Sequence, residues 1–286
     1  MRLLAFSAAC LTLLLASLPA RALVVAPAPI PDRVALADVI VVGKITAIED
    51  KGVMAARYPA SADKVEFKVA LIQADQLLKG AKVNRIRLGF VPPPPPPKPG
   101  APVIGGGVYR FPQLNHAVGQ EAIFFLTRHH EQDFYVANMY YEVIDKKNAN
   151  FDKDLAEIKR CAALLEMPTE SLQSKNADDR LATAAMLLAR YKSIKPGSKP
   201  NPKQEPIPAE ESKQILEAIA SGDWSVAGRD PTRVSPLQLF YRLGLTPQDG
   251  WVQPKLKDPQ KELPVLVQKW LKDNAAKYRI QKFVSE

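Results

Sequence analysis

The hydrophobic periodicity of this chain changes once, near residue 150, and the change divides the sequence into two parts. Before it, apolar side chains alternate with polar ones or form short β-branched runs, as in strands that are half or fully buried. After it, from Asp152 onward, apolar residues recur at intervals of three and four, as on one face of a helix. We therefore predict an α+β protein in which the strands precede the helices.

Five strands of uneven length are expected in the first part, residues 37–150. Short links and one long loop join them and no crossover helix intervenes, which favours antiparallel pairing in a small, partly open β-barrel of the OB type. In the last strand, alternation would point Tyr140 outward and Tyr135 and Tyr141 toward the core. The expected strands are Ala37–Asp50, Val65–Leu71 with its continuation to Gly80, Ile86–Phe90, Glu121–Arg128 and Phe134–Ile144.

The second part, residues 151–286, is expected to be a small all-α domain with a lysine- and proline-rich linker at 193–208. Asn176 is expected to cap the helix that follows it, because an asparagine side chain can accept a backbone N–H of the first turn. The other expected helices run from Asp152 to before Pro168, over Ala209–Ser221, between Ser235 and Gly244, and around Val265–Arg279.

The N-terminus has the pattern of a targeting segment. Arg2 precedes the apolar run Leu3–Leu18, and Ala20-Arg21-Ala22 forms an A-x-A cleavage signal. The run has sixteen residues, whereas a membrane span needs about 20. We therefore expect residues 1–22 to be a cleaved signal peptide, with an uncleaved anchor as the alternative, and the mature chain to be secreted or periplasmic without a transmembrane span. Residues 23–36 would form a leader that ends in a short helical turn capped by Asp32.

Cysteine usage and charge restrict the partners. Cys161 is the single cysteine after the expected signal peptide, so no internal disulfide can form, and its place on an apolar helix face predicts a buried thiol. The formal charge is +9, and without Arg2 and Arg21 the 37 remaining basic residues exceed the 30 acidic ones by 7. Such a surface favours an anionic partner, either a protein or a surface polymer, and export makes nucleic acid an unexpected ligand. A solvated surface without a dedicated partner is the alternative, and the oligomeric state stays open.

Three segments of the first part resemble a known domain. ADVIVVGKITAIED (Ala37–Asp50), LLKG (Leu77–Gly80) and GQEAIFFL (Gly119–Leu126) are similar to the strand motifs of the netrin-like domain of tissue inhibitors of metalloproteinases, an OB-type barrel. The resemblance covers about residues 37–143 and implies a binding unit rather than an enzyme. In those inhibitors a disulfide-bonded N-terminal cysteine presents its amine and carbonyl to the protease zinc. The expected mature N-terminus here, Leu23, has no cysteine near it, so that mechanism does not carry over.

The helix expected after Asn176 also resembles one helix of a HEAT-type repeat. At most one or two such units can be counted in this sequence, whereas solenoids generally need about three or more repeats. We therefore expect a small helical bundle with one HEAT-like element.

Candidate metal ligands cluster in one short segment, where His129, His130 and Asp133 lie within five residues. Adjacent histidines at a strand end point to opposite faces, so a polar turn explains these residues with fewer assumptions. Neither a metal nor another cofactor is expected. Local motifs for nucleophilic, zinc-dependent or nucleotide-dependent catalysis do not occur in the sequence.

Candidate binding residues are Tyr140 and three consecutive glycines, Gly105, Gly106 and Gly107, in the long loop. This loop begins with six prolines, Pro92–Pro97, which favour a stiff polyproline II conformation. The loop could dock on a proline-binding module or be a surface excursion from the barrel. We expect an exported, non-enzymatic binding module that uses the barrel face or the basic C-terminal surface, with an envelope-acting hydrolase as the alternative.

Overall fold

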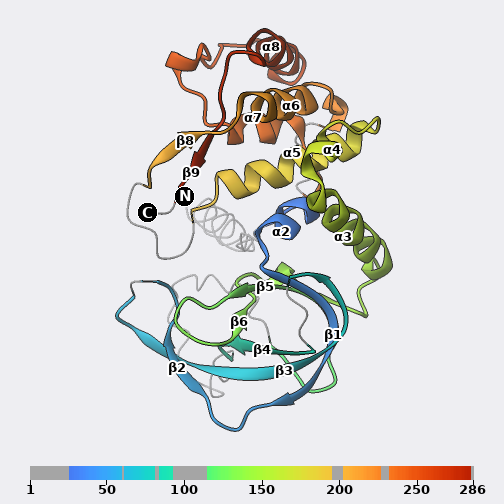
Figure 1. Cartoon of the computed structure of the whole chain (residues 1–286), viewed down its shortest axis with the longest axis vertical. Helices are drawn as coiled ribbons and strands as arrows, with labels where there is room; N and C mark the ends of the chain where they lie inside the picture. Colours follow the sequence, from blue (N-terminus) through green and yellow to red (C-terminus); the bar gives the residue numbers. More distant parts are fainter. Residues whose placement is uncertain are drawn as a thin grey trace, which may run out of the picture. The chain divides into compact units, whose positions relative to one another are not determined.

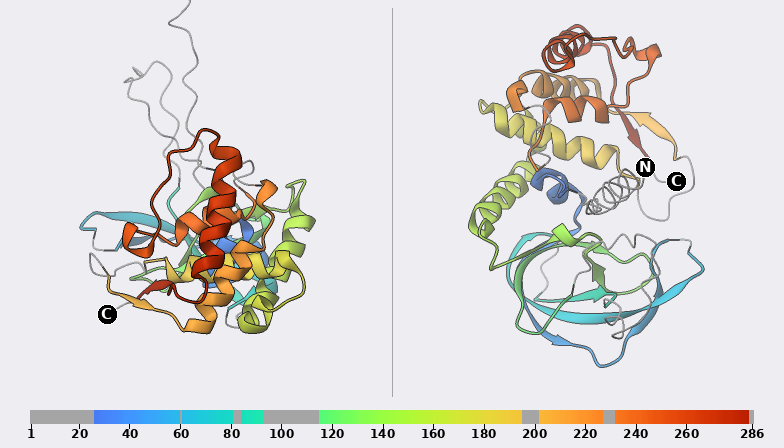
Figure 2. Two further views of the ribbon diagram at one scale, coloured as in Figure 1. Left: turned by 90° about the horizontal axis from the view of Figure 1, so that it is seen from above. Right: turned by 180° about the vertical axis from the view of Figure 1, so that it is seen from behind.

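The computed structural model describes residues 26–59, 61–80, 84–92, 115–194, 202–226 and 232–284. These residues form an α+β fold with a large, strongly curved β-sheet and several helices, as Figures 1 and 2 show from three sides. The expected signal peptide, the greater part of the proline-rich loop, and Gly105, Gly106 and Gly107 lie outside the described residues.

The sheet contains seven strands rather than the five expected. β1 pairs with β3 on one side and with β5 on the other, and the pairings continue from β3 through β4 and β6 to β5. All pairs are antiparallel except β4 with β6. The count differs because β2 was not expected and because the expected strand Phe134–Ile144 is divided into β6 and β7; β2 pairs only with β3, and β7 only with β5. The strands are β1 (Val39–Ile48), β2 (Val53–Ala56), β3 (Lys64–Lys79), β4 (Arg85–Phe90), β5 (Glu121–Arg128), β6 (Tyr135–Val136) and β7 (Val143–Asp145).

The prediction of one continuous strand over Phe134–Ile144 is wrong, because the structure divides this segment into two short strands. Between β6 and β7 a 3-10 turn, η1 (Tyr140–Glu142), interrupts the extended chain. The Glu142 carboxylate accepts hydrogen bonds from the backbone N–H groups of Asn138 and Met139, at 3.2 Å for Met139. A side chain that bonds to nearby backbone amides competes with strand pairing. Tyr140 therefore lies in a turn and not on the outward face of a strand.

Two glycines allow the close packing of the sheet. A β-carbon at Gly43 would lie 2.5 Å from the backbone oxygen of Gln73, where β1 and β3 show register shifts. A β-carbon at Gly89 would lie 2.3 Å from Cε2 of Phe134, whose ring is buried. The curvature of β1 and the position of the Phe134 ring both require the absence of a side chain.

The helices agree with the expected order but differ in their ends. Asn176 caps α5 as predicted, because its Oδ1 accepts the Asp178 N–H at 2.9 Å. The last helix begins earlier than expected, at Pro259, where proline suits the first turn. The helices are α2 (Ile30–Leu36), α3 (Phe151–Glu166), α4 (Pro168–Leu172), α5 (Ala177–Tyr191), α6 (Ala209–Ala220), α7 (Pro236–Arg242) and α8 (Pro259–Asn274), with 3-10 turns η2 (Trp224–Val226) and η3 (Pro247–Asp249).

The second part of the chain is not purely helical. Two short strands, β8 (Gln204–Pro206) and β9 (Gln281–Phe283), pair antiparallel, and Ile207 extends this pairing by donating its N–H to the Ile280 carbonyl at 2.9 Å. β8 lies inside the segment that was expected to be a linker. Three residues per strand are too few to show an alternation in the sequence, so the pairing could not be predicted.

The hydrophobic core is shared between strands and helices. One cluster contains Ile40 and Phe125 from the sheet together with Val34 of α2, Ile158 of α3 and Met186 of α5. A second, larger cluster lies among α5, α6, α7 and α8. Cys161, also in the first cluster, is fully buried as predicted.

Helix α2 is held by ionic contacts that replace the predicted cap. Its N-cap residue is Pro29, and Asp32 caps nothing. Instead, the Asp32 carboxylate accepts two hydrogen bonds from the Arg242 guanidinium of α7, at 2.9 and 2.6 Å. This bidentate pair joins residues that are 210 positions apart. Asp32 was therefore assigned to the wrong interaction because its partner is remote in the sequence.

The C-terminal carbonyl groups of α2 are also satisfied from other elements. Lys79, at the end of β3, donates from Nζ to the Val34 carbonyl at 2.7 Å and to the Ala37 carbonyl. Arg190, in the last turn of α5, donates from Nε to the Ala35 carbonyl at 3.3 Å. Cations at a helix C-terminus are favourable because the exposed carbonyls carry partial negative charge. Strand β3, α2 and α5 are thereby connected.

Candidate functional site

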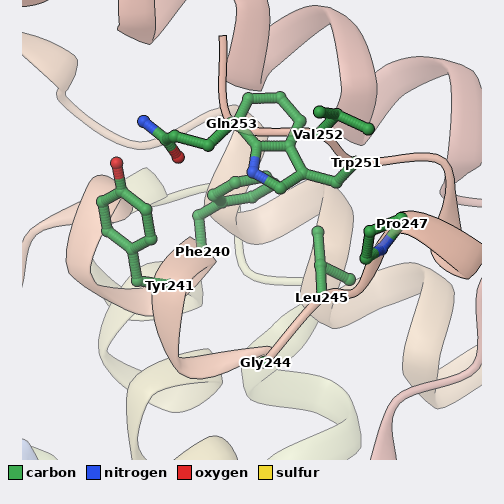
Figure 3. Close-up of a pocket in the computed structure, with 8 residues that line it drawn as sticks. All are labelled: Phe240, Tyr241, Gly244, Leu245, Pro247, Trp251, Val252 and Gln253. Atoms are coloured by element: carbon green, nitrogen blue, oxygen red, sulfur yellow. The ribbon is translucent and has the colours of Figure 1, made fainter.

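A pocket of about 300 Å³ lies beside α7, and we refer to it as the α7 pocket. Figure 3 shows its lining residues, which come from α7, from the turn that follows it, from η3 and from the segment after η3. Aromatic and aliphatic side chains dominate the lining, and no charged residue contributes to it. The lining residues are Phe240, Tyr241, Gly244, Leu245, Pro247, Trp251, Val252 and Gln253.

Two tight turns bring the aromatic residues of the pocket together. After α7, Gly244 adopts a φ of +70°, and after η3, Gly250 adopts a φ of +75°. Both values lie in the left-handed region that glycine tolerates best. Between them, Thr246 and Asp249 form a capping box around η3. The chain therefore doubles back and places the Trp251 ring on the Phe240 ring, with centroids 4.7 Å apart at 80°.

The base of the pocket is rigid because Phe240 is part of the helical core. Its ring is buried and also contacts the Trp270 ring of α8, with centroids 5.6 Å apart. Trp270 in turn contacts the ring of Tyr278 at 5.5 Å. Edge-to-face contacts of this kind stabilise a fixed arrangement of rings.

The outer part of the pocket is open to solvent. Tyr241 and Val252 are 49% and 69% exposed. The Tyr241 hydroxyl, the Gln253 amide and the Trp251 indole N–H have no hydrogen-bond partner among the residues that the structure describes. In Figure 3 the Tyr241 hydroxyl and the Gln253 amide lie at one side of the pocket, and Leu245 and Pro247 lie at the other. The pocket thus combines an apolar side with a side that can form hydrogen bonds.

The predicted metal candidates are engaged in other contacts. His129 is buried, its Nδ1 accepts the Glu131 and Gln132 N–H groups at 3.2 Å, and its Nε2 donates to the Ala56 carbonyl at 3.2 Å. Neither ring nitrogen of His129 is left for a metal ion. Burial, and next the adjacent His130, lower the pKa of His129, which favours this neutral form. The structure therefore gives His129 a role in holding a turn.

The other two candidates do not complete a metal site with His129. The His130 ring stacks on the His129 ring at 4.3 Å, with its Nε2 3.6 Å from Glu131. Asp133 is exposed and lies 3.4 Å from Arg128. In the described part of the chain, no group of three or more His, Cys, Asp or Glu residues is placed to hold a metal ion.

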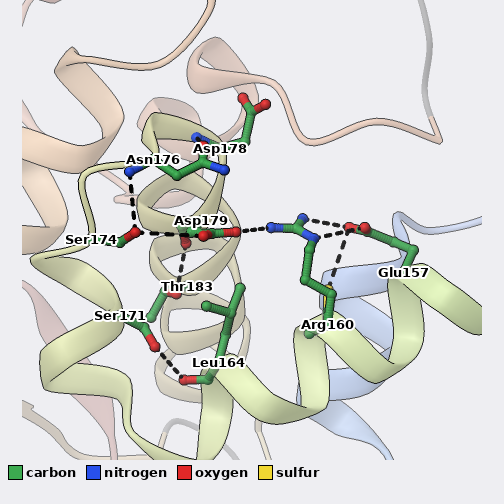
Figure 4. Close-up of polar contacts among 10 residues, drawn as sticks. Glu157, Arg160, Leu164, Ser171, Ser174, Asn176, Asp178, Asp179 and Thr183 are labelled. Atoms are coloured by element: carbon green, nitrogen blue, oxygen red, sulfur yellow. Dashed lines mark hydrogen bonds and ion pairs between the residues drawn. The ribbon is translucent and has the colours of Figure 1, made fainter.

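A polar network joins α3 and α5. In Figure 4, Arg160 of α3 contacts Glu157, at 2.7 Å, and Asp179 of α5. The Ser174 hydroxyl lies 3.5 Å from the Asp179 carboxylate, but no histidine belongs to the network. Cys161 lies 3.5 Å from Glu157, and burial, followed by the charge of Glu157, raises its pKa. A thiol with a raised pKa is a poor nucleophile at neutral pH.

The binding residues predicted from the sequence lie outside the α7 pocket. Tyr140 lies in η1, where its ring contacts the Tyr141 ring at 5.3 Å, and it is remote in sequence from the α7 pocket. The signal that could have indicated the pocket is three aromatic residues, at positions 240, 241 and 251, with Gly244 and Gly250 between them. Glycine-bounded turns that carry aromatic residues bring ring faces together, but the pairing of those rings depends on the folded core.

No family model matches the chain, and no curated protein matches it. None of the helices in the described part of the chain is both long and apolar enough to span a membrane. The functional argument therefore depends on the geometry of the chain itself.

Proposed function

We propose that this protein is an exported, non-enzymatic binding module and that the α7 pocket receives an apolar side chain of a partner protein. The observation that carries the proposal is the lining of the pocket. Rigid aromatic rings form its base, two exposed apolar or aromatic side chains form its rim, and no charged group enters it. Aromatic residues around a small concave site are typical of the anchor points of protein interfaces.

Binding is favoured over the alternative, an envelope-acting hydrolase, by the chemistry of the described side chains. The pocket contains no serine, cysteine, histidine or carboxylate that could act as nucleophile or base. His129 is engaged in a turn, and His116 is buried against Phe90 and hydrogen-bonded with Gln120 at 3.0 Å. A nucleophile and a base within hydrogen-bond reach are the minimum for hydrolytic chemistry of the triad type.

The charge of the chain supports an acidic partner. The stretch from Lys255 to Lys282 directly follows the pocket and contains 8 basic and 3 acidic residues. A cationic surface beside an apolar pocket favours a partner segment that carries carboxylates next to an apolar side chain. This interpretation selects the basic C-terminal surface, rather than the strand that was expected to carry Tyr140, as the place of binding.

We propose further that the sheet is an OB-type barrel of the netrin-like kind. Support comes from its pairings, which lead from β1 through β3, β4, β6 and β5 back to β1. In this proposal the barrel and helix α2 carry the helical part, and Tyr140, Gly105, Gly106 and Gly107 remain a predicted second contact region. The barrel role is secondary to the pocket, because the described residues of the sheet provide no comparable aromatic lining.

The test is site-specific photo-crosslinking in cells that produce the protein, with p-benzoylphenylalanine in place of Val252. The matched control places it at Val118, which is 62% exposed in the turn before β5. We expect a discrete crosslinked protein from position 252 that is absent from position 118 and is lost on Trp251→Ala. That protein, once identified and purified, should bind the chain. Equal crosslinking from both positions would contradict the proposal, and an intact mass that begins at Leu23 would support export.

A further inference from the structure

We infer that the α7 pocket binds a proline-rich segment in the polyproline II conformation, flanked by acidic residues. This inference rests on the proposed function and specifies the chemical class of the partner. Three features of the pocket lead to it: the orientation of the rings, the type of hydrogen-bonding groups and the charge of the chain that follows.

The rings provide the apolar surface that proline requires. The Trp251 ring is held at 80° on the buried Phe240 ring, which fixes the orientation of Trp251 in the pocket. Tyr241 extends this surface outward, and Pro247 lies on the opposite side in Figure 3. Grooves lined by aromatic rings accept the rings of successive prolines in polyproline II peptides.

The polar groups of the pocket match the backbone of such a ligand. The Tyr241 hydroxyl, the Trp251 indole N–H and the Gln253 amide can each donate a hydrogen bond, and none has a partner among the described residues. A run of prolines has no backbone N–H, and all its carbonyl groups are free to accept. A run of prolines therefore needs no hydrogen-bond acceptor from the pocket, which lacks carboxylates.

The small size of the pocket favours a preformed ligand. About 300 Å³ is at the lower end of the range of binding pockets, so the contact area is limited. A flexible peptide loses conformational entropy when it binds, and this loss reduces its binding free energy. A polyproline II helix is already extended and stiff, so it loses less. A small pocket can consequently bind a polyproline II segment more tightly than a flexible segment with the same contacts.

The charge requirement comes from two lysines close to the pocket. Lys255 and Lys257 are exposed and follow Gln253 by two and four residues. Lys255 is therefore within about 7 Å of Gln253 along the chain. A carboxylate beside the proline run can approach these ammonium groups, and a lysine there would be repelled.

The experiment is a calorimetric titration of the mature chain with a blocked peptide of six prolines and a glutamate at each end. Two comparison peptides replace the glutamates by lysines or the prolines by glycine and serine. We expect binding of the acidic proline peptide, several-fold weaker binding of the lysine peptide and no binding of the glycine–serine peptide. Trp251→Ala should weaken binding by at least about tenfold, as for an interface hot spot.

Because Trp251 also contacts the core, two variants on exposed side chains keep the result interpretable. Tyr241→Phe removes a hydroxyl and Gln253→Ala removes a side-chain amide, and both side chains are exposed. Each substitution should weaken binding several-fold, while the control Tyr58→Phe, at an exposed tyrosine of the sheet region, should not. Equal binding of the glycine–serine peptide, or unchanged binding in both variants, would overturn the inference. If the peptide fails but the crosslink at Val252 captures a specific partner, the ligand class is wrong and the binding function stands.

Discussion

The ion pair between Asp32 and Arg242 is expected to be the most sensitive single contact in the fold. The substitution Arg242→Met removes this ion pair. It keeps a long, unbranched side chain but leaves the Asp32 carboxylate without its two hydrogen bonds. The Asp32 side chain is only 9% exposed, so water cannot fully replace the lost partner. An uncompensated buried charge costs about 3–5 kcal/mol.

The two partners are not equally buried, and this predicts an order of effects. Asp32→Asn leaves Arg242 unpaired, but the Arg242 side chain is 30% exposed and can be partly hydrated. We therefore expect Asp32→Asn to cost about 2 kcal/mol and Arg242→Met about 3–4 kcal/mol. The double variant Asp32→Asn/Arg242→Met should cost less than the sum of these two single costs, because it leaves no buried charge.

The assay is urea denaturation followed by circular dichroism, with thermal melts alongside. A loss of 3 kcal/mol corresponds to a decrease in Tm of roughly 6–12 °C for a chain of this size. The matched control is Lys269→Met, which breaks a surface pair with side chains 73% and 57% exposed and should change stability by less than about 0.5 kcal/mol. If Arg242→Met behaves like this control, or if the double variant equals the sum of the single ones, the reasoning is refuted.

Three further predictions concern local contacts. Asn176→Ala should lower the free energy of unfolding by about 1 kcal/mol through the loss of the α5 cap, and Asn176→Asp should retain it. Gly89→Ala should cost about 1–3 kcal/mol in urea denaturation, because the new β-carbon would overlap the Phe134 ring; an unchanged midpoint would contradict the packing. His129 has a lowered pKa in the folded chain, so it should reduce stability as the pH falls below about 6.5, when the unfolded chain binds the proton first. Melts of the wild type and of His129→Phe between pH 7.5 and 5 should therefore converge, and a constant difference would show that His129 does not titrate with unfolding.

Elements whose interaction partners lie close by in the chain could be predicted from the amino-acid sequence. The strand Glu121–Arg128 was predicted with its observed ends. A short, continuous run of apolar residues with high β-propensity is typical of a strand that is covered on both faces. Ile86, Leu88 and Phe90 were correctly assigned to the buried face of β4 by their alternation. Asn176 was recognisable as a cap because the amide that it accepts lies two residues away. Periodicity and capping act within a few residues, and these predictions succeeded for that reason.

Contacts between residues that are remote in the sequence could not be predicted, because they depend on how the whole chain folds. Asp32 has the local pattern of a helix cap, but its carboxylate accepts hydrogen bonds from the guanidinium of Arg242, 210 residues away, and caps no helix. Phe134–Ile144 has the alternation of a strand, but the Glu142 carboxylate accepts hydrogen bonds from two backbone amides, and the chain turns there. The α7 pocket depends on how Phe240 packs against Trp251 and Trp270, which no periodicity encodes. Hydrogen bonds and ring contacts of this kind form only after the core has brought their partners together, so they can be read from the folded chain alone.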